Sequence, residues 1–562
     1  MNKPRFIAGP PGTGKTHKFI VDMYMKALEK YTPEKIIILS HTNIAANEIR
    51  DAIFDLKNLK NEEGHYIFPQ LRGITKKAMK HRVCTIHTYC KSRLLKKEMF
   101  NLHNHKELIN KDSRFNLHRE DDIQRKHRFY KYLSDADGHG ETLDKYWIKC
   151  NQKSFDPYGL TLIKELLPLY EKYKKDHNLC DFSDMINNFT RQTYNEKTKQ
   201  LEDDVKDPDI DMLIIDECQD CNVPQRKAID KMARNVKEGH YYLVGDADQT
   251  LFEYSGSDAK YFHNLAANPY YELKEGSRCG EAINTYCKSI IFDVWEHYKS
   301  HRVWTPAKYQ EKHKKGRIGE VIEGTGYYLP DLKPSGNLNK LLDKIKNTEE
   351  TFLFTYRGTP SDVRCTDFLM AQGIEFAPVS KPAFVIKKEL RAHKLWPEFI
   401  KGIPMDLTQI KHFCEYLSKD LIIGDKSKAT ETIKKWIKKD YTVDYLIDNK
   451  LLKSTCKGHK DFDLIRAPVN NHKERMEYIK KVLHNGFDFD KKVRVEYANI
   501  HTVKGLTYDN VIVDETIVNK DPYFTSRRLQ YTAYSRGIFD YWRLAKMSGK
   551  KYFTIGKKNE CL

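Results

Sequence analysis

The chain has 562 residues, of which 40% are hydrophobic and 31% are charged. This length exceeds what a single hydrophobic core supports and predicts two to four domains. No stretch approaches the roughly 18 to 20 apolar residues that a helix needs to cross a bilayer, which argues against a membrane-embedded protein. The formal net charge of +19 favours polyanionic partners, nucleic acid first, although a lysine-rich solvated surface gives the same excess.

The N-terminal sequence MNKPRFIAGPPG lacks the basic and apolar segments of a signal peptide, so we expect an intracellular, cytoplasmic protein. Twelve cysteines are spread along the chain, and among them only Cys218 and Cys221 stand at C-x-x-C spacing. That spacing suits a metal site or a redox pair, but tetrahedral zinc needs about four paired nitrogen or sulfur ligands. We therefore expect mostly reduced, buried thiols and no structural zinc.

The first predicted elements are a short strand, RFIAG at residues 5–9, a glycine-rich turn and an amphipathic helix. The turn fits G-x-x-x-x-G-K-[ST], the pattern of a phosphate-binding loop. Backbone N–H groups are expected to hold the β-phosphate, with Lys15 reaching the β- and γ-phosphates and Thr16 binding Mg²⁺. A glycine turn without a nucleotide is the alternative, but the pattern arises by chance only rarely. The expected nucleotide-binding residues are Gly9, Pro10, Pro11, Gly12, Thr13, Gly14, Lys15 and Thr16.

An apolar run at residues 212–215, MLII, ends in Asp216 and Glu217. Such a run fits a buried parallel strand that presents carboxylates at its C-terminal edge, where the phosphate loop also lies. We expect Asp216 to bind the nucleotide through Mg²⁺, together with Thr16, and Glu217 to act as the general base toward the attacking water. The alternative is a strand that merely ends in solvated acids. Because Lys15 and Asp216 lie far apart in the sequence, a large segment must be inserted between them.

A third apolar run, YYLVG at residues 241–245, is again followed by acids and then by Gln249. A glutamine at this place can hydrogen-bond both the γ-phosphate and the hydrolytic water, and can thereby sense the nucleotide state. Phe252 and Tyr254 follow in a predicted loop, where exposed rings beside a basic surface suit base stacking. An F-x-Y pair is more often part of a core, so both interpretations stay open.

Nine segments, in the same order along the chain, resemble motifs of the UvrD/Rep-type DNA helicases of superfamily 1. They are SHTNIAANEI at 40–49, TIHTYC at 85–90, DFSDMI at 181–186, DECQD at 216–220, GDADQ at 245–249, GSRCGEAI at 276–283, LFTYR at 353–357, IHTVKGLTYD at 500–509 and YTAYSRG at 531–537. Each segment alone is a weak signal, but nine in collinear order are specific. The ring-forming AAA+ ATPases share the loop GPPGTGKT and have no reason to carry the later segments.

The resemblance implies an α/β fold with two RecA-like P-loop domains, in which parallel sheets are flanked by helices and each domain carries a mainly helical or mixed insertion. Its implied boundaries are 1–90 and 179–274 for the first domain, 91–178 for its insertion, 275–376 and 493–562 for the second domain, and 377–492 for its insertion. Both insertions are lysine-rich, which fits contact with duplex DNA and equally fits a solvated helix face.

The resemblance also implies ATP and Mg²⁺ as cofactors, and single-stranded and forked DNA as partners. Arg278 and Arg536 match arginines that reach the γ-phosphate, where they stabilise transition-state charge only when the domains close. The implied catalytic set is Glu217, Gln249, Arg278 and Arg536. The implied DNA-binding set is His41, Thr42, Asn43, His87, Phe252, Tyr254, His501 and Lys504. Gln219 and Asp220 are expected to link the hydrolytic site to Gln249 and to the DNA.

The chain departs from the family pattern around the base and the sugar of the nucleotide. Only eight residues precede Gly9, so we expect the adenine-reading segment to be absent, and His17, Ser277 and Thr507 replace residues that usually contact base or ribose. We therefore expect weak discrimination among nucleoside triphosphates. Ser255 stands where many members have arginine, which puts one DNA contact in doubt.

Together these features predict a DNA-dependent ATPase that moves 3′ to 5′ along single-stranded DNA and separates duplex strands. Two alternatives keep the motor: it remodels protein–DNA complexes without processive unwinding, or it moves 5′ to 3′. A third alternative is a binding module with an inactive phosphate loop. Against that third alternative stand the intact Lys15, Thr16, Asp216, Glu217, Arg278 and Arg536.

Overall fold

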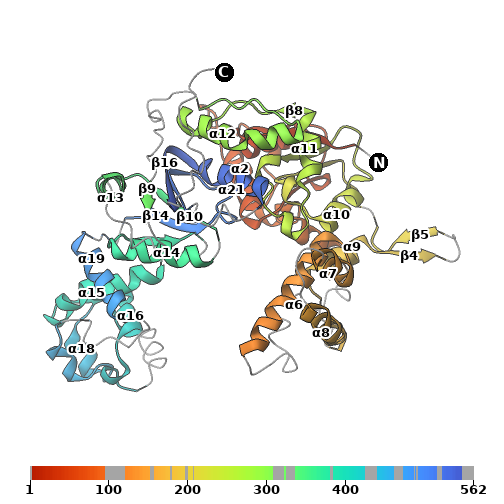
Figure 1. The fold of residues 1–562 in the computed structure, drawn as a ribbon. Helices are drawn as coiled ribbons and strands as arrows, with labels where there is room; N and C mark the ends of the chain where they lie inside the picture. The colour runs from red at the N-terminus through yellow and green to blue at the C-terminus, as the bar shows by residue number, and fades with distance from the viewer. Residues whose placement is uncertain are drawn as a thin grey trace. The chain divides into compact units, whose positions relative to one another are not determined.

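The computed structural model of the chain describes residues 3–94, 120–151, 157–176, 180–195, 200–206, 208–307, 322–324, 336–357, 359–379, 384–424, 440–460, 462, 472–486, 488, 491–514 and 522–546 (Figure 1). The chain divides into two compact units. The first consists of Met1–Lys315 and Tyr523–Ser535, and the second of Gly316–Pro522 and Arg536–Leu562. Within the described ranges, no helix combines the length and the apolar character that crossing a bilayer requires.

The first unit is built on a six-stranded sheet in which every pairing is parallel. In spatial order the strands are β3 (Val83–Thr85), β2 (Ile36–Ser40), β6 (Met212–Ile215), β7 (Tyr241–Gly245), β1 (Arg5–Ala8) and β8 (Tyr271–Glu272). Ala8 pairs with Gly245 and Ile215 pairs with Leu243, so β1, β6 and β7 end at the same edge of the sheet. The loops that carry the predicted nucleotide chemistry leave the sheet at this edge.

Alternate residues of these strands enter two hydrophobic cores, because successive side chains of a strand point to opposite faces. Phe6, Leu39 and Leu213 belong to one core, and Ile7 and Ile214 to the other. The first core also takes residues of α4 (Ile86–Arg93), α9 (Phe182–Thr190), α10 (Val223–Ala233) and α11 (Ala259–Ala267), and the second takes residues of η1 (Lys15–Ile20), α1 (Val21–Ala27), α2 (Asn43–Lys57) and α3 (Lys76–Met79). Both faces are therefore covered, which explains the continuously apolar strands.

Three further groups of elements complete the first unit. Helices α12 (Glu281–Tyr298) and α21 (Tyr523–Tyr534) pack against each other. Helices α6 (Glu120–His139), α7 (Leu143–Asn151) and α8 (Pro157–Asp176) share a small core of their own around Phe129 and Tyr170. Strands β4 (Gln192–Asn195) and β5 (Gln200–Asp203) form an antiparallel pair. Helices α6, α7 and α8 make up most of the described part of the predicted first insertion, which is therefore helical.

The second unit contains another six-stranded parallel sheet. Its order is β11 (Phe376–Pro378), β14 (Val495–Asn499), β10 (Phe352–Tyr356), β15 (Tyr508–Asp514), β16 (Gly537–Lys546) and β9 (Ile322–Gly324). Its core also takes residues of α13 (Gly336–Asn347), α14 (Thr359–Ala371) and α19 (His472–His484). The first unit's arrangement of buried parallel strands and helices therefore recurs here.

Most of the predicted second insertion packs around its own apolar core in the second unit. This core contains Trp396, Phe399 and Phe413, and the Trp396 indole donates to the carbonyl of His459 at 2.8 Å. Its elements are α15 (Phe384–Ile400), β12 (Met405–Asp406), α16 (Leu407–Tyr416), β13 (Asp440–Tyr441) and α18 (Val443–Asp448). Parts of both predicted insertions, residues 95–119 and 425–439 among them, lie outside the described residues.

The predicted fold class is confirmed, since two parallel sheets flanked by helices carry mainly helical additional segments. The compact units divide the chain differently from the predicted boundaries at two places. Residues 275–315 and Tyr523–Ser535 belong to the compact unit of the first sheet. The domain boundaries implied by the family resemblance stay a prediction.

Candidate functional site

The phosphate loop leaves β1 at the edge where β7 also ends, and the Gly9 N–H donates to the carbonyl of Gly245 at 3.0 Å. Gly12 has φ +70° and Gly14 has φ +84°, a region that glycine adopts without steric cost. The Thr13 hydroxyl donates to the carbonyl of Pro10 at 2.7 Å, and the Lys15 ammonium donates to the carbonyl of Gly9 at 2.7 Å. The ammonium is therefore held over the loop, where a bound phosphate would lie.

Asp216 follows β6 at the same edge and is almost fully buried. Its N–H donates to the carbonyl of Leu39 at 2.7 Å. Burial, and then the neighbouring Glu217 carboxylate, raise the pKa of Asp216 to about 7, while the Lys15 ammonium opposes this shift. Among the described residues its Oδ1 has no hydrogen-bond partner. A buried carboxylate oxygen of this kind fits a ligand of a divalent cation, as predicted for Mg²⁺.

Glu217 lies in the left-handed region, with φ +50°, which is uncommon for a residue with a side chain. Such strain persists only where surrounding contacts fix it, and it is frequent at functional sites. Here the Gln219 amide donates to Glu217 Oε2 at 2.5 Å, and Gln219 Oε1 accepts from the Asp246 N–H at 3.1 Å. A Cβ at Gly245 would lie only 2.2 Å from Gln219 Oε1. Gln219 thus joins the predicted base to the end of β7, and glycine makes room for it.

Gln249 ends η7 (Ala247–Gln249) and donates from its side-chain amide to Asp246 Oδ2 at 2.8 Å. The same carboxylate accepts from Arg302 at 2.8 Å and from the Tyr531 hydroxyl at 3.3 Å. Neither Arg302 nor Tyr531 was predicted from the sequence to have a role in the site. Arg302 lies outside every recognised segment, and an arginine just after a helix ordinarily complements the helix C-terminus. No local spacing could have revealed it.

Arg278 lies directly against the phosphate loop. A Cβ built on Gly12 would lie 2.5 Å from Arg278 Cβ, and the N–H and hydroxyl of Ser277 each donate to the carbonyl of Gly12 at 2.7 Å. The Arg278 guanidinium donates to the carbonyl of Ser535 at 3.4 Å. Arg536 belongs to the second unit, where it is buried and its carbonyl accepts from the Tyr508 N–H at 2.9 Å. The roles predicted for the two arginines stay predictions.

Several residues of the predicted DNA-binding set meet in the first unit. The rings of His41 and Phe252 are 5.5 Å apart, and those of Phe252 and Tyr254 are 6.1 Å apart. Tyr254 is 52% exposed, so it is not a core residue. The Thr42 hydroxyl caps α2 by accepting from the Ala45 N–H, and Asn43 next to it is exposed. Tyr254 therefore has the exposure that a base-stacking surface needs, whereas Phe252 is half-buried.

The remaining predicted DNA contacts differ in charge and location. Burial, and then the His41 charge, lower the pKa of His87 to about 4, and its ring meets the Phe182 ring edge-on at 5.5 Å. At neutral pH the His87 imidazole is therefore uncharged and can only donate or accept a hydrogen bond. His501 and Lys504 belong to the second unit, where Asn499 Oδ1 bonds the His501 N–H and lies 2.9 Å from its Nδ1.

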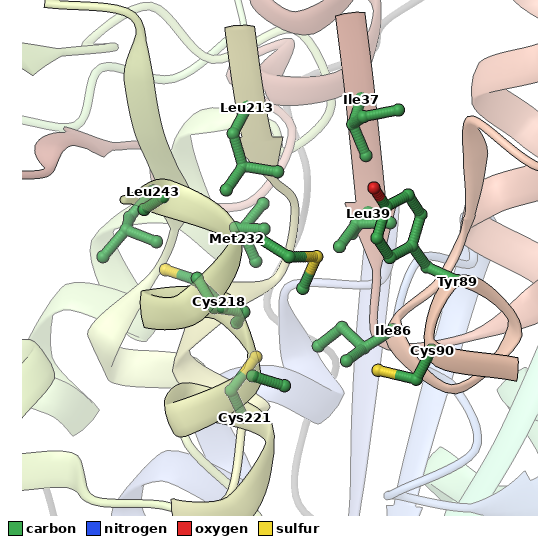
Figure 2. Close-up of a cluster of buried hydrophobic side chains, with 14 of the residues drawn as sticks. Ile37, Leu39, Ile86, Tyr89, Cys90, Leu213, Cys218, Cys221, Met232 and Leu243 are labelled. Atoms are coloured by element: carbon green, nitrogen blue, oxygen red, sulfur yellow. The ribbon is translucent and has the colours of Figure 1, made fainter. Parts of the chain in front are cut away.

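The cysteine pair of DECQDC faces the hydrophobic core (Figure 2). Cys218 and Cys221 are each 1% exposed and lie in the cluster that includes Leu213, Met232 and Leu243. Burial raises the pKa of the Cys218 thiol well above its ordinary value. Ten of the cysteines in the described ranges are buried, and none of these ten is in a disulfide. In this turn the carboxylates and Gln219, rather than the thiols, belong to the candidate site.

The sheet edge therefore has the organisation of the P-loop nucleotide-binding proteins. A glycine-rich loop, a strand-end acidic pair and a hydrogen-bonded glutamine meet there. The model of the UvrD/REP helicase N-terminal domain family matches residues 1–269, so this part of the chain is similar to that family. The resemblance expected from the motifs is confirmed.

A curated protein with a related sequence is the ATP-dependent DNA helicase Rep of Buchnera aphidicola subsp. Baizongia pistaciae (strain Bp). The two sequences are 31% identical over 106 residues. The match covers 17% of this chain and only 14% of that helicase. It therefore supports the family assignment over a short segment.

Proposed function

We propose that the protein is an ATP-dependent DNA helicase, a DNA-dependent ATPase that moves along single-stranded DNA and separates duplex strands. The observation that carries this proposal is the hydrogen-bonded chain from Glu217 through Gln219 to Asp246 and Gln249. A strained, positioned carboxylate next to a phosphate loop suits a general base for phosphoanhydride hydrolysis. The family match over residues 1–269 and the net charge of +19 support DNA as the partner.

Within this proposal the chain's own residues bind and orient the nucleotide and the water. The loop N–H groups and Lys15 hold the phosphates. Glu217 takes the proton of the attacking water, and the Gln219 amide fixes the orientation of the Glu217 carboxylate. Thr16 and Asp216 would hold Mg²⁺, which neutralises charge on the phosphates when bound.

Coupling to DNA follows from the short distance along the chain between Gln249 and Tyr254. Gln249 is held by Asp246 at the end of β7, while Tyr254 lies exposed in η8 (Glu253–Ser255). A base stacked on Tyr254 can therefore displace the segment that carries Gln249. This linkage favours hydrolysis stimulated by single-stranded DNA over a basal ATPase without a motor function.

The decisive experiment combines hydrolysis with strand displacement. Phosphate release is measured with and without single-stranded DNA, and displacement is measured on forked, 3′-tailed and 5′-tailed duplexes. We expect stimulated hydrolysis and displacement from 3′-tailed and forked substrates. Hydrolysis indifferent to DNA would refute the motor. Displacement from 5′ tails alone would reverse the proposed polarity.

A translocase that remodels protein–DNA complexes is the alternative within the same class. It would hydrolyse ATP on single strands, displace a bound protein and leave naked duplexes intact. Weak nucleotide selectivity is a further part of the proposal, because the Ser277 hydroxyl is occupied by the Gly12 carbonyl at 2.7 Å. A preference in kcat/KM for ATP over GTP above about a hundredfold, ~2.7 kcal/mol, would rule that part out.

A further inference from the structure

We propose that Arg302 is a positioning residue of this motor: it fixes the Asp246 carboxylate, and through it the Gln249 amide, in the orientation that DNA-stimulated hydrolysis requires. The inference rests on the proposed function and adds to it a residue outside every recognised helicase segment. Arg302 does not itself touch the phosphate loop. It acts through Asp246, whose two carboxylate oxygens receive different donors.

The geometry divides the Asp246 carboxylate between two tasks. Its Oδ1 accepts from Arg302 Nη1 at 2.8 Å and from the Asp248 N–H at 3.1 Å. Its Oδ2 accepts from the Gln249 amide at 2.8 Å and from the Tyr531 hydroxyl at 3.3 Å. The two oxygens of an aspartate carboxylate rotate together about the Cβ–Cγ bond, so neither oxygen can turn without moving the other. The Arg302 contact therefore sets the place at which Gln249 is held.

Arg302 reaches this position because of the turn that ends α12. Lys299 has φ +52° and closes the helix, and the Ser300 N–H donates to the carbonyl of Trp295 at 3.1 Å. Val303 then donates its N–H to Glu272 Oε1 at 3.0 Å, which fixes the chain on the far side of Arg302. The guanidinium is thereby directed inward, and its side chain is 1% exposed.

The same turn brings a second buried acid to Arg302. Arg302 Nη2 lies 3.7 Å from Asp248 Oδ2, an atom that also accepts from the Trp295 indole at 2.8 Å. Arg302 thus faces both acids of GDADQ, Asp246 and Asp248. A guanidinium presents several donors in a fixed plane, so it can hold two carboxylates at once, whereas a lysine ammonium on its flexible chain orients them less well.

Stability alone gives a poor account of this arrangement. Burying a charged pair carries a desolvation penalty that its attraction often fails to exceed, and apolar replacements of buried pairs are commonly as stable. Within the described residues, Arg302 Nε and Nη2 find no hydrogen-bond acceptor, so the penalty is only partly offset. The Arg302 guanidinium fixes the orientation of the Asp246 carboxylate, which an apolar side chain in its place could not do.

The segment that Arg302 anchors at one end is also held at the other. Arg528 of α21 donates to the carbonyl of Thr250 at 3.0 Å and pairs with Glu253. The stretch from Asp246 to Glu253 therefore connects Gln249 to the loop of Tyr254 between two buried arginines. Arg302 is the one that contacts the carboxylate holding Gln249.

The test is a double-mutant comparison of steady-state hydrolysis with saturating single-stranded DNA. Arg302→Gln should lower the DNA-stimulated kcat about tenfold or more while KM for ATP changes less than about threefold. Arg302→Lys, which keeps the charge, should recover part of the loss. Since Arg302 acts through Asp246, the Asp246→Asn/Arg302→Gln double variant should be no slower than Asp246→Asn alone.

The control is Arg475→Gln, which removes a guanidinium from the buried Glu389 in the second unit. It should lower the melting temperature as Arg302→Gln does and leave kcat unchanged. If Arg302→Gln does not fold, Arg302→Lys carries the test: a lower kcat at unchanged KM supports the proposal, and a wild-type kcat overturns it.

Two further outcomes separate this inference from the proposed function. Losses that multiply in the double variant, or a wild-type kcat in folded Arg302→Gln, overturn the role of Arg302 while DNA-stimulated hydrolysis by the wild type keeps the motor. Hydrolysis by the wild type that DNA does not stimulate overturns the proposed function and this inference together.

Discussion

The two units contain the same kind of sheet, six parallel strands between helices, but different residues follow the strands. In the first unit β1, β6 and β7 are followed by Gly9, Asp216 and Asp246, which meet at one edge. In the second unit β10 and β14 are followed by Arg357 and Ile500. The sheet thus provides an edge, and the one or two residues beyond each strand decide its chemistry.

The largest expected effect on hydrolysis comes from Glu217, the proposed base at the edge of the first unit's sheet. Glu217→Gln keeps the shape and the contact with Gln219 but cannot take a proton, so phosphate release should fall roughly 10²- to 10⁴-fold while nucleotide and DNA binding persist. The matched control is Asp514→Asn, at the buried acid that ends β15 in the second sheet. It should leave hydrolysis within about threefold of wild type. Turnover that survives in Glu217→Gln would mean that the base is misassigned.

A pair of glycines tests whether the phosphate loop differs from an ordinary left-handed turn. Gly12 and Gly402 have φ +70° and +93°, but a Cβ at Gly12 would lie 2.5 Å from Arg278 Cβ, whereas a Cβ at Gly402 meets nothing within 4 Å. Both alanine variants should lose about 1 kcal/mol of stability from backbone strain. Gly12→Ala should in addition lose at least about tenfold in kcat/KM, about 1.4 kcal/mol. Equal kinetics for the two variants would contradict the close approach of Arg278.

The sequence predicted the elements of the first edge well because each has a local signal. An apolar run followed by Gly9, Asp216 or Asp246 places that residue at the end of a strand, and parallel strands end together. The thiols of Cys218 and Cys221 were also assigned to buried surroundings, which Figure 2 shows. These inferences needed only residue type and spacing.

The sequence did not reveal contacts between side chains from distant segments. Arg302 and Tyr531 both contact the Asp246 carboxylate, yet the turn after α12, helix α21 and the end of β7 are far apart in the chain. Such contacts depend on helix packing and on the turn at Lys299, which a motif of neighbouring residues does not record. Similarly, the apolar character of Trp396 predicts burial but not the separate core that it forms.

The next prediction concerns Tyr254, the exposed ring that follows the nucleotide-site edge of the first sheet. Tyr254→Ala removes a stacking surface, so binding of single-stranded DNA should weaken by about 1 to 3 kcal/mol, roughly 5- to 150-fold. Basal hydrolysis should change less than about threefold, because the phosphate loop is untouched. Tyr270→Ala is the control, since Tyr270 is 59% exposed and its ring contacts Arg5. Fluorescence anisotropy with labelled oligonucleotides measures both; equal losses would exclude specific stacking.

The last prediction concerns the pH dependence of stability that a buried histidine near Asp248 gives to the first unit. His263 is fully buried, and burial, followed by the charges of Arg302 and Arg528, lowers its pKa to about 2. Its Nε2 lies 3.9 Å from Asp248 Oδ1 and its Nδ1 lies 2.9 Å from the Ser300 hydroxyl. Because the unfolded state takes up a proton below pH ~6.5 and the native state does not, this residue's contribution is full above that pH and is lost as the pH falls.

At pH 5 the loss amounts to about 2 kcal/mol of the free energy of unfolding. Burial raises the pKa of Asp248 to about 7, so that carboxyl contributes in the opposite direction, and the comparison of wild type with His263→Gln isolates the histidine. Urea unfolding at pH 7 and pH 5 should show a loss that is about 2 kcal/mol smaller in the variant. An identical loss in both proteins would mean that the imidazole is protonated in the folded state. The Asp248 carboxylate would then lie beside two cations, Arg302 and the protonated His263.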